Sequence, residues 1–255
     1  MRGKELVEDI YPLSPMQQGM LFHSLQRQES DVYFRQISYT VHGSLNLEAF
    51  QRSWERLLER HSVLRTAFVW KNVDRMLQVV LREVPLPLEY EDCRHLPSAA
   101  MQERLETYLT EDRQRGFNLS KAPLMRVALL HESKDVFHIV WSHHHALIDG
   151  WSTALLLNEL AAYYQAFSSG QDLRLAHPRP YRDYIDWFQQ KDRSKTEAYW
   201  RNTLDGFTTP TPLPFSAAAQ PAADSRHLVE RGTQLGQRWF ARLQSVARTH
   251  QLKQT

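Results

Sequence analysis

Reactive side chains gather most densely in "SHHHALIDGWS", residues 142–152. Three consecutive histidines, His143 to His145, are followed after a three-residue spacer by Asp149 and Gly150. Such a stretch can be a metal site, a general base with an orienting carboxylate, or the end of a buried strand whose polar groups bind the backbone. Each interpretation implies a different protein.

Metal binding is the least favoured of the three. A metal needs three or more ligands in a suitable shell, and the stretch has neither a His-Glu-x-x-His arrangement nor paired cysteines. We therefore predict no bound metal. A general base needs a neutral imidazole, near the usual histidine pKa of about 6.5, that points into a cavity while a partner orients its second nitrogen. No nucleophilic serine or cysteine is paired with the histidines.

The flanking elements place this stretch on a strand-to-helix turn. Residues 135–145, "DVFHIVWSHHH", are so continuously apolar before the histidines that they predict a central strand covered on both faces. Residues 151–167 have apolar side chains nearly all round, which predicts a buried helix. Asp149 can cap that helix, and Gly150 permits a close backbone approach. The structural alternative, a cap with histidines satisfied by the backbone, is weakened because several titratable groups beside an apolar strand must be satisfied at once.

Strands and amphipathic helices alternate along the rest of the chain, which predicts an α/β layered domain. Strands are expected within residues 34–43, 64–70, 76–81 and 124–130, and helices within residues 14–26, 46–61, 98–117, 181–189 and 195–204.

Two of these helices carry further expectations about burial. The first begins at Ser14, with Gln17 three residues later as in a capping box, and should turn its apolar side chains inward. The helix at 181–189 has aromatic residues at helical spacing, which favours a place in the core. The residues concerned are Met16, Met20, Leu21 and Phe22 in the first helix, and Tyr181, Tyr184, Trp187 and Phe188 in the other.

The pattern breaks at residues 208–225, which hold four prolines and almost no charge. This composition predicts an extended connector. After it we expect one strand, within 227–235, and one helix, within 237–250. Two elements cannot build a core of their own, so they are interpreted as the beginning of a second, truncated lobe.

Composition excludes several classes of function. Hydrophobic residues make up 42% and charged residues 24% of the chain, as in an ordinary soluble globular protein. The net charge is +2 and the basic residues are spread out, so neither a nucleic-acid partner nor a membrane surface is indicated. No stretch approaches the roughly 18 apolar residues that span a bilayer, and no signal-peptide core is present. The single cysteine, Cys93, cannot form an internal disulfide, which fits a cytoplasmic location.

Four motifs, in order, resemble the condensation domains of nonribosomal peptide synthetases, which have a chloramphenicol acetyltransferase-like fold. "HHALIDG" is similar to the family's HHxxxDG motif. The opening motif is matched by "YPLSPMQQGMLFHSL", the second by "RHSVLRTAF" and the fourth by "YRDYIDW". The resemblance implies an N-terminal lobe at residues 11–207, a connector at 208–225 and a truncated C-terminal lobe at 226–255. Residues 1–10 are similar to the end of a docking segment.

The resemblance also implies an acyltransferase that forms peptide bonds in antibiotic and other secondary metabolism. His145 would be the catalytic residue, His144 would pack inward, Asp149 would orient the loop through Arg65, and Gly150 would leave space beside the reacting carbonyl. The substrates would arrive on the 4'-phosphopantetheine of carrier-protein domains, so that no cofactor is bound. An adjacent adenylation domain and an upstream synthetase subunit would be further partners.

Two alternatives stay open beside peptide-bond formation. One is an epimerization domain, which has the same fold and also carries HHxxxDG, although its opening motif usually differs from "SPMQQGML". The other is a non-catalytic fragment that only binds carrier proteins or an upstream subunit. Because the family's active site lies between two lobes, the 255-residue chain is expected to be inactive by itself.

Overall fold

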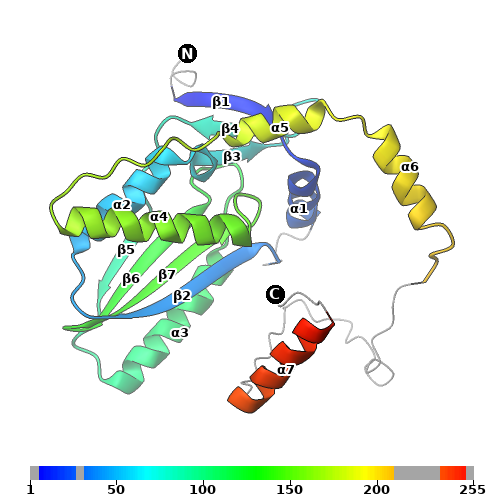
Figure 1. The fold of residues 1–255 in the computed structure, drawn as a ribbon. Helices are drawn as coiled ribbons and strands as arrows, with labels where there is room; N and C mark the ends of the chain where they lie inside the picture. Colours follow the sequence, from blue (N-terminus) through cyan, green and yellow to red (C-terminus); the bar gives the residue numbers. More distant parts are fainter. Residues whose placement is uncertain (1–5, 27–31, 210–235, 251–255) are drawn as a thin grey trace. The chain divides into compact units, whose positions relative to one another are not determined.

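The computed structural model describes residues 6–26, 32–209 and 236–250 (Figure 1). The chain divides into two compact units, Met1–Pro221 and Ala222–Thr255. In the second unit the described element is helix α7 (Gln237–Thr249), which confirms the helix expected there. The expected strand at 227–235 and all but two residues of the expected connector lie outside the described residues.

The first unit contains two sheets and six α-helices within its described residues. The strands are β1 (Val7–Pro12), β2 (Phe34–His42), β3 (Thr66–Val69), β4 (Leu77–Leu81), β5 (Leu88–Asp92), β6 (Met125–Ser133) and β7 (Val136–His144). The helices are α1 (Pro15–Gln26), α2 (Leu47–Arg60), α3 (Ser98–Arg115), α4 (Gly150–Ser168), α5 (Tyr181–Gln189) and α6 (Ser194–Thr203), with a short 3₁₀ helix, η1, at Ser62–Arg65.

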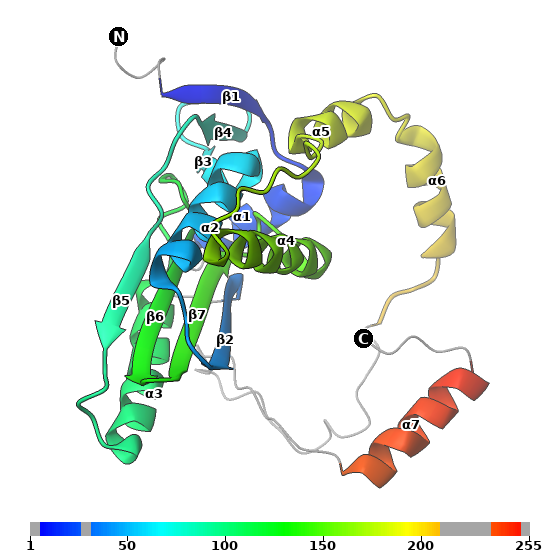
Figure 2. The ribbon, with the colours of Figure 1, turned by 60° about the vertical axis from the view of Figure 1, so that its left-hand side comes forward.

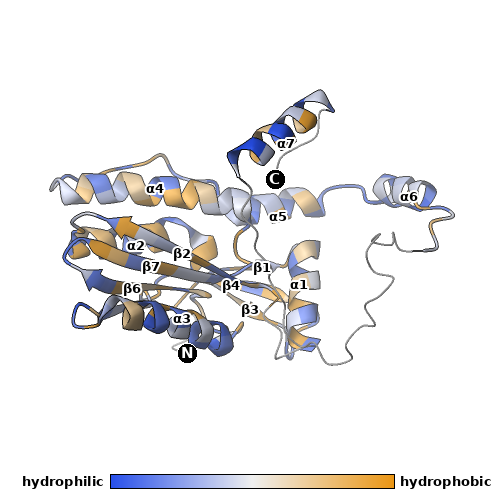
Figure 3. Cartoon of the chain, turned by 90° about the horizontal axis from the view of Figure 1, so that it is seen from below, coloured by the Kyte–Doolittle hydropathy of each residue, from blue (hydrophilic) through white to orange (hydrophobic). Residues whose placement is uncertain are grey.

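The larger sheet has the strand order β2-β7-β6-β5. Strand β7 pairs antiparallel with both β2 and β6, whereas β5 and β6 are parallel. Helices α2 and α4 lie on one face of this sheet and α3 on the other (Figures 2 and 3). The prediction of a central strand covered on both faces is therefore confirmed for β7.

The core on the α2 and α4 face is built around aromatic side chains. Trp54 of α2 and Trp141 of β7 lie ring to ring at 5.1 Å, and both are almost fully buried. Leu156, Tyr163 and Phe167 of α4 close the same cluster. Burial of such side chains contributes most of the free energy that holds helices on a sheet.

The smaller sheet has the order β1-β4-β3, with antiparallel pairs. Helix α5 packs on it through Ile185, which is buried with Tyr11 and Val80. Neither β1 nor β5 was expected from the sequence. Both strands lie at a sheet edge and have a charged, half-exposed pattern, which hides the apolar alternation that predicts a strand.

Several burial expectations are wrong. On α1, Leu21 is buried, but Met16 and Phe22 are 71% and 56% exposed. Helix α4 is not buried all round, because Trp151 and Leu155 near its beginning are exposed. On α5, the aromatic stripe is only partly core, since Tyr184 and Trp187 are exposed. In each case only one face of the helix is buried against the rest of the first unit.

A buried ionic network ties α3 to the larger sheet. The carboxylate of Asp112 is fully buried and accepts hydrogen bonds from Gln36 (2.7 Å), Ser142 (2.5 Å) and Arg126. Arg126 also donates to the carbonyl oxygens of Asp112 and Gly116, at 2.6 and 2.8 Å. Burial acts to raise the pKa of Asp112, but the donors outweigh it and hold the pKa below the usual range.

Replacing Asp112 by alanine should therefore destabilise the fold by about 3 to 5 kcal/mol near neutral pH, because the change leaves Arg126 buried without its counter-charge. A lowered pKa contributes stability above the unfolded value of about 4, and this contribution is lost as the pH falls through the folded value. The difference between parent and variant should shrink below about pH 4 in urea unfolding. Glu91→Ala, which removes a partly exposed pair with Arg104, is the control and should cost less than about 1 kcal/mol. Equal losses in the two variants would contradict the assignment.

Candidate active site

The histidine stretch forms the turn between the end of β7 and the beginning of α4, as predicted. The backbone N–H of His145 donates to the carbonyl of Tyr33, at 2.8 Å, so the turn stays tied to β2 just after the ladder ends. The N–H of Leu147 donates to the carbonyl of His144, at 3.0 Å. Leu147 and Ile148 are buried in the main core, which fixes the far side of the turn.

His145 has one ring nitrogen engaged and the other free to react. Nδ1 lies 3.0 Å from the carbonyl oxygen of Ile148. Since a carbonyl can only accept, Nδ1 carries the proton and a neutral ring has its lone pair on Nε2. Nε2 makes no hydrogen bond to any described residue, and the side chain is half-buried. This nitrogen can accept a proton from a substrate and return it.

His144 packs inward, as expected. Its Nδ1 accepts a hydrogen bond from the backbone N–H of Ala146, at 3.2 Å, so Nε2 carries the proton and faces the hydroxyl of Ser24 at 3.4 Å. Burial, with a smaller effect of His145, lowers the pKa of His144 to about 4. His144 therefore holds the turn as a neutral group.

His143 is a buried neighbour of the site for which no role was expected. It is 2% exposed, and its ring lies 4.9 Å from that of Trp141, tilted by 39°. Burial, with smaller effects of His145, Arg35 and His144, lowers its pKa to about 3. Two of the three histidines are therefore neutral at physiological pH.

Asp149 caps α4, as predicted. Its carboxylate accepts hydrogen bonds from the backbone N–H and the hydroxyl of Ser152, at 2.8 and 2.7 Å. These two bonds lower the pKa of Asp149. A Cβ built on Gly150 would meet no atom within 4 Å, so the space beside this residue is open in the first unit.

The expected pair of Asp149 with Arg65 is wrong. Arg65 lies in η1, is almost fully buried, and donates to the carbonyl oxygens of Leu58 and Glu59 at 2.9 and 3.0 Å. It also donates to the carbonyl of Leu81 at 2.9 Å and to the carboxylate of Glu8 at 2.5 Å. Arg65 therefore binds the end of α2 to the smaller sheet, and each of its three side-chain nitrogens donates there.

The resemblance implied that Arg65 and Asp149 act together, but in the structure each side chain has other partners. A guanidinium is satisfied by carbonyl oxygens as well as by a carboxylate. The open carbonyls at the end of α2 lie next to η1, and nothing in the sequence separates these acceptors from a distant aspartate.

Gln17 is the site residue that sequence reasoning missed. It forms the expected capping box with Ser14, because its side-chain oxygen accepts the N–H of Ser14 at 2.9 Å and its own N–H donates to the hydroxyl of Ser14 at 3.2 Å. Its amide group also donates to the carbonyl of Ala146, at 3.0 Å, inside the histidine turn. The opening motif and the histidine motif thus meet in the structure.

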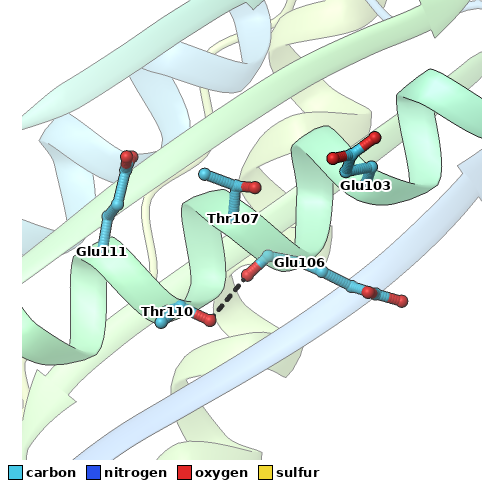
Figure 4. A pocket seen from close by; sticks show the side chains of 5 residues that line it. All are labelled: Glu103, Glu106, Thr107, Thr110 and Glu111. Carbon is cyan, nitrogen blue, oxygen red and sulfur yellow. Dashed lines mark hydrogen bonds between the residues drawn. The ribbon is translucent and has the colours of Figure 1, made fainter.

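A shallow acidic hollow lies on the outer face of α3, away from the histidine turn (Figure 4). It is lined by Glu103, Glu106, Thr107, Thr110 and Glu111. It contains no histidine. Among the described residues, no group of three His, Cys, Asp or Glu side chains is arranged to hold a metal ion.

The comparisons agree on the class of protein. The family model of the condensation domain matches residues 7–255. The chain belongs to the condensation domain family, and its fold is the α/β, chloramphenicol acetyltransferase-like layered sandwich. The starter condensation domain of rhizomide synthetase superposes with a TM-score of 0.71 at 20% identity, over 80% of this chain and 50% of that chain.

The curated relatives that are similar in sequence are nonribosomal peptide synthetase proteins. One of the linear gramicidin synthase proteins of Brevibacillus parabrevis is 40% identical over 247 residues, which are 96% of this chain and 5% of the relative. One of the plipastatin synthase proteins of Bacillus subtilis (strain 168) is 42% identical over 208 residues, 82% of this chain and 8% of the relative. The chain thus spans a small part of these synthases and half of the matched condensation domain.

The two buried histidines should make the fold pH-sensitive. A histidine whose pKa is lowered by folding contributes stability above its unfolded pKa of about 6.5, and this is lost as the pH falls because the unfolded chain binds the proton first. The free energy of unfolding should fall by about 1.4 kcal/mol per pH unit for each such residue between about pH 6 and 4. His144→Gln, whose amide retains an acceptor and a donor, should flatten this slope in a series of urea unfolding curves. An unchanged slope would contradict the neutral assignment of His144.

Arg65 and Asp149 should act independently on stability. Arg65→Met leaves three carbonyl oxygens without their donor and should cost at least about 2 kcal/mol, whereas Asp149→Ala removes a helix cap and should cost about 1 kcal/mol. The double variant should lose the sum to within about 0.5 kcal/mol in urea unfolding, since the two residues share no partner. A coupling energy well above this value would restore the rejected pair.

Proposed function

We propose that this chain supplies the histidine-bearing half of a condensation domain that forms peptide bonds. In this proposal both substrates are aminoacyl or peptidyl thioesters on the 4'-phosphopantetheine arms of carrier-protein domains, and the chain itself binds no cofactor. The observation that carries the proposal is His145, whose Nδ1 is fixed by the carbonyl of Ile148 while Nε2 is free. Membership of the condensation domain family supports the reaction class.

The proposed reaction begins when the acceptor amine attacks the donor thioester carbonyl. The new C–N bond forms, the carbonyl oxygen takes up negative charge, and the nitrogen becomes positive. Nε2 of His145 accepts a proton from this nitrogen, and the resulting imidazolium stabilises the oxyanion. The C–S bond then breaks and the proton passes to the departing sulfur, which leaves a peptide on the acceptor arm and a free thiol on the donor arm.

The other residues would keep this geometry in place. His144 anchors the turn from inside, Asp149 fixes the beginning of α4, and Gly150 leaves open space where a substrate carbonyl can approach. Arg65 would support the site only indirectly, through the junction of η1, α2 and β4.

The proposed partners are carrier-protein domains, with an adenylation domain in the same synthetase. A solved four-domain nonribosomal peptide synthetase, bound to AMP and glycine, superposes with a TM-score of 0.63 over 78% of this chain and 15% of that chain, at 21% identity. An upstream synthetase protein that docks through residues 1–10 is a further proposal. No helix in the described ranges is long and apolar enough to cross a membrane.

The test replaces the matching part of a condensation domain from linear gramicidin synthase with residues 1–207. The chimera is offered two loaded carrier proteins, and the dipeptidyl thioester is measured by mass spectrometry. His145→Ala should lower the rate of product formation at least about 100-fold, the usual contribution of a positioned acid–base group. Exposed His23→Ala is the matched control and should leave the rate unchanged.

Each outcome separates the hypotheses. An active chimera that keeps its rate after His145→Ala would remove His145 from the reaction. A product without a new peptide bond but with an inverted donor stereocentre would favour an epimerization domain. Carrier binding without product, in a chimera whose unmodified host is active, would favour a non-catalytic binding fragment. The 255-residue chain, which spans half of the matched domain structure, is expected to give no product alone.

A further inference from the structure

The opening motif of the chain meets the histidine turn through a buried pair of amide side chains. Gln17 of α1 and Gln78 of β4 exchange two hydrogen bonds, from Gln17 Nε2 to Gln78 Oε1 at 3.1 Å and from Gln78 Nε2 to Gln17 Oε1 at 2.9 Å. Gln17 is 4% exposed and Gln78 is fully buried. Buried amides of this kind cost free energy unless their donors and acceptors are satisfied, so their placement is specific.

The surrounding partners fix the orientation of both amide groups. Gln17 Oε1 accepts the N–H of Ser14 at 2.9 Å, and Gln17 Nε2 donates to the carbonyl of Ala146 at 3.0 Å. Gln78 Nε2 donates to the carbonyl of Pro12 at 3.1 Å. Since a backbone N–H can only donate and a carbonyl can only accept, neither amide can be turned over without losing these bonds.

The bond to Ala146 acts on His145 through the backbone. Ala146 directly follows His145, and its carbonyl belongs to the turn that carries Ile148 opposite the His145 ring. On the other side, the N–H of His145 is held by the carbonyl of Tyr33. The turn is thus held by the sheet at His145 and by Gln17 at Ala146.

We infer that Gln17, paired with Gln78, is a positioning residue for His145: by holding the Ala146 carbonyl it keeps the Ile148 carbonyl opposite Nδ1 and so fixes the tautomer that leaves Nε2 unprotonated. This inference rests on the proposed role of His145. Gln17 touches no reacting atom in it. Its effect is on the orientation and the tautomer of the imidazole.

Gln17 also belongs to the capping box of α1, so the test must separate capping from positioning. Gln17→Glu does so, because a carboxylate still accepts from Ser14 and Gln78 but cannot donate to the carbonyl of Ala146. The matched control is Gln18→Glu, the same change at the next, exposed residue, whose amide donates only to the carbonyl of Leu13. A second variant, Gln78→Met, removes the amide partner while it leaves the capping box intact.

The measurement is nitrogen-15 NMR of the histidine rings in the 255-residue protein at alkaline pH, where imidazoles are neutral. The signal that disappears in His145→Gln identifies the residue. In the parent and in Gln18→Glu, this signal should report a proton on Nδ1 and none on Nε2. In Gln17→Glu both nitrogens should move toward the averaged shifts of a freely exchanging imidazole, and Gln78→Met should move them in the same direction by less.

The result that overturns the inference is an unchanged tautomer of His145 in Gln17→Glu, with the far-ultraviolet circular dichroism of the parent. If Gln17→Glu does not fold, Gln78→Met decides: unchanged shifts in that variant, with the parent's circular dichroism, also overturn it. The readout needs no catalysis. A chain that fixes this tautomer but gives no peptide bond in the chimera would refute the proposed function and leave the positioning role intact.

Discussion

The site depends on the central place of β7 in the larger sheet. Both edges of this strand are hydrogen-bonded, to β2 and to β6, and both of its faces are covered by helices. Its backbone cannot shift without breaking two ladders, so the position at which the chain leaves the sheet is fixed. His145 is the first residue after the strand, and its N–H still bonds to Tyr33. The ring of His145 therefore stands directly after a strand that is fixed at both edges and on both faces.

Burial makes the neighbouring polar groups either neutral or fully paired. His143 and His144 lose their tendency to bind protons because their rings are removed from water. Asp112 lies on the opposite face of the sheet and stays ionised because Ser142 and Arg126 donate to it. Ser142 precedes the histidines directly, so the same strand is anchored by an ionic network on one face and carries neutral imidazoles at its end. The ionised pair of Asp112 and Arg126 therefore stabilises the sheet and α3, whereas the buried imidazoles next to the turn are neutral.

The sequence predicts the parts of the fold and of the site whose contacts join residues close together in the chain. The strand, the turn, the Asp149 cap and the following helix are contiguous in the sequence, so the pattern of their residue types predicts them. The Ser14 and Gln17 capping box is local as well. The contact of Gln17 with Ala146 spans 129 positions and uses a backbone carbonyl, which any residue could provide, so no pattern of side chains predicts it.

The predicted partner of Arg65 was wrong for the same reason, because its acceptors are mostly carbonyl oxygens. Periodicity likewise showed that α4 is apolar nearly all round, but not which of its faces the first unit covers, and Trp151 stayed exposed.

These contacts explain why the turn relies on neutral hydrogen bonds. Asp149, a carboxylate close to His145, is exposed and already engaged by Ser152. An ion pair at such an exposed place would contribute little and would weaken with salt. The bonds from His145 to Ile148, from Ala146 to His144 and from Gln17 to Ala146 are directional and largely shielded from water. A ring held by directional bonds keeps the same nitrogen facing outward whatever the charge of the group that approaches it. This property suits the proposed reaction, in which the attacking nitrogen and the carbonyl oxygen gain opposite charges together and lose them in later steps.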